Sequence, residues 1–231
     1  MNKVLIVGHP SSGYHEVEVI LHRYGLGTAK ASRREGLTPF EISQSLLKAH
    51  GAPSLRSVLS EDEFMRIEPG AVWHGMALDL MLGNIDQPLW GWSDPQNIFL
   101  LDYWASLDPR LTFVLVYTEP QRALMEAAQQ GNETPATDEI EQLIDNWVAF
   151  NGALLRFFLR NPKRCLLVHS QQVSCAVDSY LGRLQPLLET PLVCKQLQHT
   201  SAAEAIEDEV EIQKEWPLQA YGRLTLPENL A

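Results

Sequence analysis

The sequence predicts an α/β fold of three layers, in which helices cover both faces of a central, mainly parallel sheet. Two observations predict it: short apolar runs that end in turn residues alternate with segments whose apolar residues recur at helical spacing. The 231 residues, 45% of them hydrophobic, suffice for one large domain with a substantial core. We expect this domain to span residues 1–200 and an acidic C-terminal helix and tail to span 201–231.

Four apolar runs predict strands, and each of them leads into a helix. Continuous apolar runs of this length are typical of strands that are buried on both faces of a parallel sheet. The segment Leu192–Cys194 is either a minor strand or a loop. The four strand predictions are Val4–Val7, Pro88–Trp92, Leu111–Tyr117 and Cys165–Val168.

The helices are predicted from their caps and from the spacing of their apolar residues. Thr38–Glu41 combines an N-cap, a proline at the first helical position and a capping-box glutamate, and Gly51 ends this helix. Ser60–Glu63 is a second capping box, and a separate apolar helix follows from Val72 to Leu82. The other predicted helices run over residues 17–24, 94–104, 119–130, 140–155 and 173–188.

Composition excludes several classes of function. The formal net charge of −11 repels nucleic acid, anionic membranes and nucleotide phosphates unless a local cationic pocket overrides it, so we expect no nucleic-acid partner. No apolar run reaches 18 residues and the N-terminus lacks a cleavage site, which predicts a cytoplasmic protein without a membrane span. The three cysteines have neither a disulfide pattern nor zinc-ligand spacing, and no metal is expected.

The link between the first strand and its helix has the frame of a phosphate-binding loop. Gly8 and Gly13 keep the glycine spacing that lets backbone N–H groups and a helix N-terminus surround an anion. The motif then requires lysine and a hydroxyl residue, but this chain has Tyr14 and His15. An ordinary ATPase or GTPase site is therefore excluded. The alternative is that Gly8, Pro10 and Gly13 only build a tight turn.

Four segments together resemble the bacterial sulfotransferase family over about residues 1–190. They are Val4–Gly13, Pro88–Gln96, Phe113–Pro120 and the helix that contains Trp147, Asn151, Leu154 and Leu155. The resemblance implies a parallel-sheet fold of the phosphate-loop type. It also implies the donor 3′-phosphoadenosine 5′-phosphosulfate and a carbohydrate, lipid or small molecule as the acceptor.

The resemblance also assigns the donor-binding positions. Where the family has cations, this chain has the neutral residues Ser11, Ser93, Gln96 and Thr118, and where the family has an anion-binding serine it has Glu126. Each charge-assisted phosphate contact contributes about 1.5–3 kcal/mol, so these changes predict weak donor binding and no resident cofactor. The assigned positions are Gly8, His9, Pro10, Ser11, Ser12, Gly13, Tyr14, Ser93, Thr118 and Glu126.

Two histidines are the candidates for a catalytic base. His15 lies in the loop next to Glu16, and His74 lies on the apolar helix near Asp79, where a base would reach an acceptor hydroxyl. The alternative for His74 is a partly buried histidine with a structural role.

We therefore expect a sulfotransferase-like protein with lost or altered donor binding that acts as a non-catalytic binding or assembly partner. Its partner would be a protein, or a small-molecule or carbohydrate acceptor, in the synthesis of a polysaccharide or another secreted product. This hypothesis predicts an exposed apolar patch. The alternative is an active sulfotransferase whose donor site uses cations distant in the sequence, such as Arg33, Arg34 or Arg122.

Overall fold

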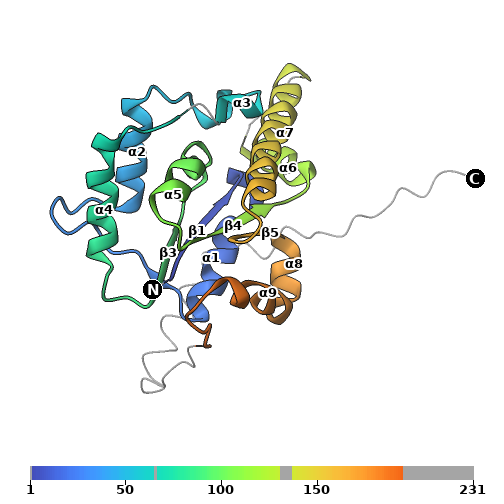
Figure 1. The fold of residues 1–231 in the computed structure, drawn as a ribbon. Coiled ribbons are helices and arrows are strands. Elements are labelled where there is room, and N and C mark those ends of the chain that lie inside the picture. The colour runs from blue at the N-terminus through green and yellow to red at the C-terminus, as the bar shows by residue number, and fades with distance from the viewer. Residues whose placement is uncertain (1, 65–66, 131–136, 195–231) are drawn as a thin grey trace, which may run out of the picture. The chain divides into compact units, whose positions relative to one another are not determined.

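Five parallel strands form one sheet in the computed structural model, which describes residues 2–64, 67–130 and 137–194 (Figure 1). Their order across the sheet is β2-β3-β1-β4-β5. The predicted helix over 201–231 lies outside the described residues. The strands are β1 (Asn2–Gly8), β2 (Gly27–Thr28), β3 (Leu89–Ser93), β4 (Leu111–Tyr117) and β5 (Cys165–His169).

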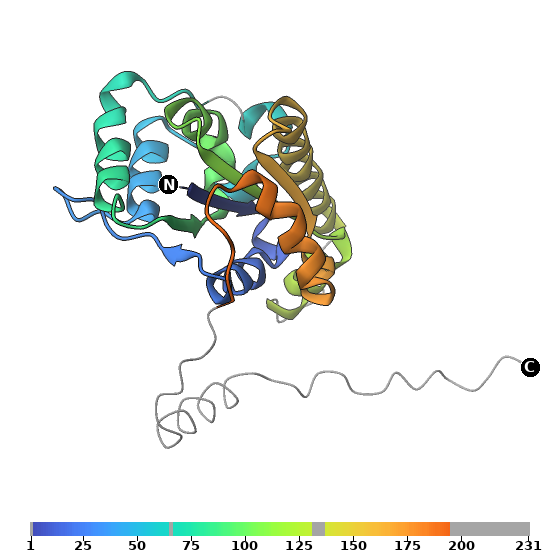
Figure 2. The same ribbon diagram turned by 60° about the horizontal axis from the view of Figure 1, so that its bottom comes forward.

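Helices cover both faces of this sheet, which confirms the predicted three layers (Figures 1 and 2). Alternate residues of each strand point to opposite faces, so Leu5 and Phe113 join one buried cluster and Ile6 and Val114 join the other. The longer helices are α1 (Tyr14–Arg23), α2 (Pro39–Ala49), α4 (His74–Gly83), α5 (Leu101–Leu107), α6 (Pro120–Gln130), α7 (Thr137–Arg160) and α9 (Val177–Leu184). The short ones are η1 (Pro10–Ser12), η2 (Leu55–Ser57), α3 (Glu61–Phe64), η3 (Ala71–Trp73), η4 (Pro95–Leu100), α8 (Ser170–Cys175) and η5 (Gln185–Leu187).

The parallel register brings the carboxyl ends of the strands together at one edge of the sheet. Ile6 of β1 pairs with Ser93 of β3, and Gly8 pairs with Val116 of β4. β5 ends at His169, opposite Tyr117 of β4. In parallel α/β sheets this edge is where ligands bind.

Strong local signals located the elements best. β4 has the predicted residues, and α6 begins one residue after the predicted start and ends at the predicted residue. The capping box of α2 is formed, because Glu41 N–H donates to Thr38 Oγ1 at 3.3 Å and Thr38 N–H donates to Glu41 Oε2 at 2.8 Å. None of the helices in the described residues is long and apolar enough to cross a membrane.

The predicted helix after Ser60 is present as α3, whose Phe64 is fully buried. Two other helix predictions were wrong. Residues 173–188 do not form one helix, because Ala176, at φ −140° and ψ 58°, leaves the helical region and separates α8 from α9. The helix predicted after Asp94 begins as the 3-10 helix η4 and becomes α-helical only at Leu101.

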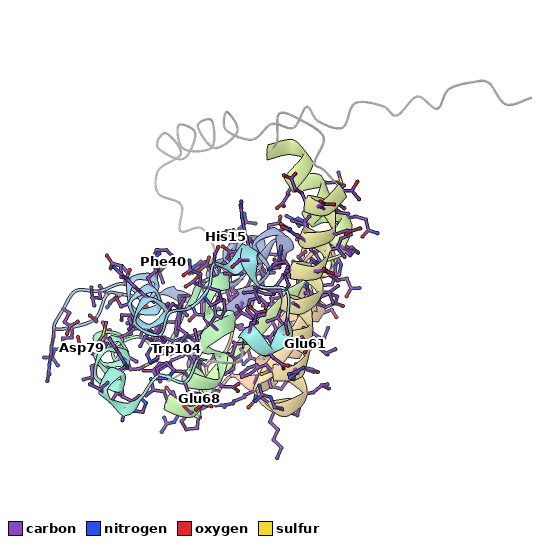
Figure 3. All side chains as sticks on the ribbon, turned by 90° about the horizontal axis from the view of Figure 1, so that it is seen from above. His15, Phe40, Glu61, Glu68, Asp79 and Trp104 are labelled. Carbon is purple, nitrogen blue, oxygen red and sulfur yellow. The ribbon has the colours of Figure 1, made fainter. Side chains whose placement is uncertain are left out.

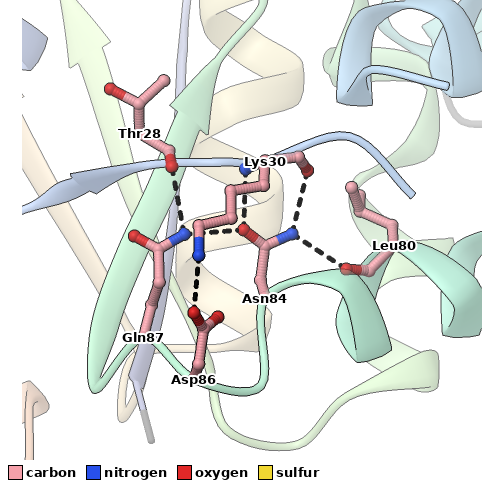
Figure 4. Close-up of polar contacts among 6 residues, drawn as sticks. All are labelled: Thr28, Lys30, Leu80, Asn84, Asp86 and Gln87. Carbon is pink, nitrogen blue, oxygen red and sulfur yellow. Dashed lines mark hydrogen bonds and ion pairs between the residues drawn. The ribbon is translucent and has the colours of Figure 1, made fainter. Parts of the chain in front are cut away.

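The loop after β2 is joined to the end of α4 by side-chain amides (Figure 4). Asn84, which is fully buried, accepts from Lys30 N–H at 2.7 Å and donates to Lys30 O at 2.9 Å. Gln87 donates to Asn84 Oδ1 at 2.8 Å and to Thr28 O at 3.1 Å, and Lys30 Nζ pairs with Asp86 at 2.6 Å. These bonds fix α4 against β2.

Candidate functional site

The loop between β1 and α1 is a tight turn with no spare volume. A Cβ on Gly8 would overlap Ser12 Oγ and would lie 2.7 Å from Val116 O, so only glycine fits there. Gly13 has a φ of +75°, which favours glycine, and a Cβ on it would lie 2.7 Å from Arg122 Nη1. The glycine frame found in the sequence is therefore required by packing within the chain itself.

His9 is held in the loop as a neutral ring. Its Nδ1 accepts from Ser11 N–H at 3.2 Å, and its Nε2 lies 3.3 Å from Asn146 Oδ1. The Asn146 amide is oriented because its Nδ2 donates to Leu55 O and Val58 O, both at 2.7 Å. Nε2 is therefore the protonated nitrogen. Burial lowers the pKa of His9, so this histidine does not replace the missing cation.

Arg122 of α6 lies against the loop and is held by two carboxylates. Its Nη2 donates to Glu16 Oε1 at 2.9 Å and its Nε to Glu126 Oε1 at 3.4 Å. Glu16 belongs to the first turn of α1, where the helix N-terminus favours an anion. One guanidinium between two carboxylates leaves this cluster with a net charge of −1, where the family binds phosphate.

A third carboxylate, that of Glu18 of α1, faces the end of β3. Ser93 stands where the family has a lysine, and its Oγ donates to Glu18 Oε2 at 2.6 Å. This position therefore offers a neutral hydroxyl bonded to a carboxylate, and no cation. Burial raises the pKa of Tyr14 to about 12, and the carboxylates of Asp94 and Glu18 act in the same direction. This end of the sheet is therefore acidic on the α1 side.

Thr118 lies at the end of β4, where the family has an arginine. It is buried, and its Oγ1 donates to Glu119 Oε2 at 3.2 Å. The second oxygen of Glu119 lies 2.9 Å from His169 Nε2 at the end of β5. Thr118 therefore contacts an acid of its own chain.

The two candidate bases are not brought together. The side chain of His15 is 70% exposed beside Tyr14, and its Nδ1 lies 3.7 Å from Glu18 Oε2 (Figure 3). His74 begins α4, and its ring lies 5.6 Å from that of Tyr103. The Asp79 carboxylate, which we expected near His74, instead accepts a hydrogen bond from Arg34 N–H at 2.7 Å. The loop that carries Arg33 and Arg34 is thereby tied to α4, and of the three proposed cations only Arg122 reaches the phosphate-type loop.

An open cavity of about 450 Å³ adjoins the loop, and its lining shows what sequence reasoning missed. Arg56 of η2 lines it and makes no hydrogen bond or ion pair with any residue that the structure describes. Arg56 and Asn146 come from segments that show no motif, so no sequence signal indicated them. The other lining residues are His9, Pro10, Ser11, Leu55, Ala123, Glu126, Glu139, Gln142 and Leu143.

Solved structures with this architecture include sulfotransferases. A sulfotransferase domain from the olefin synthase of Synechococcus PCC 7002 is similar, with a TM-score of 0.53 over 82% of this chain and 74% of that domain, at 14% identity. The chain has the sulfotransferase fold. No protein-family model matches the sequence, and the search of curated proteins found no relative.

Two further sulfotransferase structures were found at lower similarity. A sulfotransferase domain from the curacin biosynthetic pathway has a TM-score of 0.49 and 13% identity, over 95% of this chain and 94% of that one. A sulfotransferase from Mycobacterium tuberculosis H37Rv has a TM-score of 0.48 and 11% identity, over 80% and 67% of the two chains.

Asp94 supplies a test of the site's electrostatics through pH. Burial raises its pKa to about 6, against the opposing effect of the Gln96 N–H bond at 2.9 Å. Because the pKa of Asp94 is higher in the folded chain than in the unfolded chain, its protonation contributes to the free energy of unfolding. This contribution is fully present below about pH 4 and is lost as the pH rises through about 6. Between about pH 4 and pH 6 the free energy of unfolding of the natural chain should fall by on the order of 2–3 kcal/mol relative to that of the Asp94→Asn variant. Asparagine is chosen because it keeps the N-cap.

Urea unfolding of the two proteins across this pH range measures that difference. The exposed carboxylates are common to both proteins and cancel in the comparison. Parallel pH profiles of the natural chain and the variant would contradict a raised pKa at Asp94.

Proposed function

We propose that this sulfotransferase-fold protein has lost tight binding of the sulfate donor and acts as a non-catalytic binding or assembly partner of another protein. The observation that carries the proposal is the cluster on Gly13, in which Arg122 is held between Glu16 and Glu126. A phosphate entering there would have to displace carboxylates from their own counterion. The negative charges of the Glu16 and Glu126 carboxylates would also repel the phosphate.

Two other positions support the same conclusion. Ser93 and Thr118 each donate to a glutamate of the chain, and His9 is neutral. Packing within the chain requires the turn between β1 and α1, so the turn is kept although the positive charge that would bind the donor is missing.

The exposed apolar surface of α4 supports the partner role. Asp79, the single charged residue of α4, is buried, whereas Leu78 and Leu82 of that helix and Ile85 after it are exposed. We call Leu78, Leu82 and Ile85 the α4 row. A helix that turns its charge inward and leucines outward is typical of a surface that another protein covers.

Calorimetric titration with adenosine 3′,5′-bisphosphate, the donor without its sulfate, tests the proposal. We expect no binding heat at ligand concentrations up to about 1 mM, and an active sulfotransferase in the same buffer serves as the positive control. Micromolar binding would overturn the proposal.

A second candidate function, an active transferase with a rebuilt donor site, is favoured by one observation. Arg56, which pairs with none of the residues that the structure describes, lines the same cavity as Ser11, and Arg122 Nη1 would lie 2.7 Å from a Cβ on Gly13. This candidate requires micromolar binding of the bisphosphate that is lost in Arg56→Ala and in Arg122→Ala. Arg110→Ala, which removes an exposed arginine just before β4, is the matched control.

A further inference from the structure

The long helix α7 is apolar on two opposite faces. One face is buried against the sheet and includes Phe150, Leu154 and Phe157. At about 100° per residue, four exposed residues fall within about 60° of one another on the opposite face. These residues, which we call the α7 row, are Ile144, Val148, Leu155 and Leu159. Surface helices ordinarily carry polar residues there.

The spacing of the α7 row reads the same in both directions. Its four residues are separated by 4, 7 and 4 positions, with the midpoint between Asn151 and Gly152. A second copy of the helix, antiparallel to the first, would place its Leu159 opposite Ile144 and its Leu155 opposite Val148. Such a match of a surface with itself is what a two-fold symmetric interface requires.

The charges of α7 favour the antiparallel arrangement. The first half of α7 carries four exposed acidic residues and contains no Lys or Arg. In its second half Arg156 pairs with Glu61 and Asp62, and Arg160 pairs with Asp102, so this half is close to neutral. A parallel pair would set the two acidic halves side by side, which costs free energy, whereas an antiparallel pair separates them. The acids are Asp138, Glu139, Glu141 and Asp145.

We propose that two copies of this chain associate through the α7 row in an antiparallel, two-fold symmetric dimer. Stable complexes bury about 800 Å² on each partner, more than four partly exposed side chains provide. The dimer should therefore form and dissociate with concentration, with a Kd in the micromolar range. This inference does not depend on the state of the donor site.

Analytical ultracentrifugation across about 1–200 μM tests the dimer. Leu155→Glu should raise the Kd by roughly a hundredfold, because it would bury a charge at the interface. Leu82→Glu in the α4 row is the matched control, since Leu82 and Leu155 are both 46% exposed. The control should leave the Kd within about twofold, and circular dichroism would show that both variants are folded. A monomer at all concentrations, or equal effects of the two substitutions, would overturn the proposal.

Cysteine cross-linking tests the orientation in a background of Cys175→Ser and Cys194→Ser. In the antiparallel dimer Val148 faces Leu155 of the second copy, so Val148→Cys/Leu155→Cys should form a disulfide-linked dimer on mild oxidation. Val148→Cys alone should remain uncross-linked, because the two copies of residue 148 lie about 10 Å apart along the helix axis. Efficient cross-linking of the single variant would indicate a parallel pair and overturn the antiparallel arrangement.

Discussion

Ser11→Lys/Glu126→Ser should bind adenosine 3′,5′-bisphosphate with a Kd of tens of micromolar or less, whereas we expect the natural chain to give no binding heat at about 1 mM. The lysine restores a cation to the loop. The serine removes one of the two carboxylates that hold Arg122, which frees its guanidinium for phosphate. Two charge-assisted contacts of about 1.5–3 kcal/mol each amount to a gain of roughly a hundredfold or more. Titration calorimetry measures it.

The choice of positions and the control sharpen this test. Ser93→Lys is left out because Glu18, 2.6 Å from the Ser93 hydroxyl, would pair with the new ammonium. Ser106→Lys/Glu35→Ser makes the same change in net charge at exposed positions outside the loop cavity. An equal gain in this control would show that net charge alone governs binding, and no gain in either variant would show that the loop has lost more than its cations.

Gly8→Ala should destabilise the protein by about 3 kcal/mol or more, although it adds a single methyl group. That methyl would overlap Ser12 Oγ and press on Val116 O, and the neighbouring strand β4 cannot move away without breaking its pairing with β1. The midpoint of thermal unfolding should fall by about 6–12 °C. Thermal denaturation followed by circular dichroism measures the shift.

Gly75→Ala on α4 is the matched control for this substitution. A Cβ on Gly75 meets no atom within 4 Å, and alanine is the better helix former by about 1 kcal/mol, so this variant should be slightly stabilised. If Gly8→Ala unfolded at the temperature of the natural chain, packing would not be what preserves the loop.

Much of the fold could be predicted because its signals are local. The seven residues of β4, six of them apolar, and the cap of α2 each lie within one short segment, and both predictions were right. β2 was missed because two residues, Gly27 and Thr28, carry no periodic pattern. The break at Ala176 was missed because nothing in its own sequence forbids a helix; the chain turns there so that Val173 and Tyr180 both reach one core.

The site was less predictable because its contacts are distant in the sequence. Asn146 and His9 are 137 residues apart, and Arg122 and Glu16 are 106 residues apart. The missing cations could be read from the loop and from the family resemblance. That glutamates of the chain itself now contact the vacated positions could be seen only once the strands were aligned.

The amides at the end of α4 have a consequence for how copies of this chain can meet. β2 lies at the edge of the sheet, and Ala29 N–H bonds to Gly91 O of β3, so the backbone groups of Thr28 and Lys30 face outward. Asn84 and Gln87 already occupy the Lys30 N–H, the Lys30 O and the Thr28 O. Three of the four outward backbone groups of Thr28 and Lys30 are thus already bonded within the chain, which disfavours the addition of a strand from another molecule at this edge.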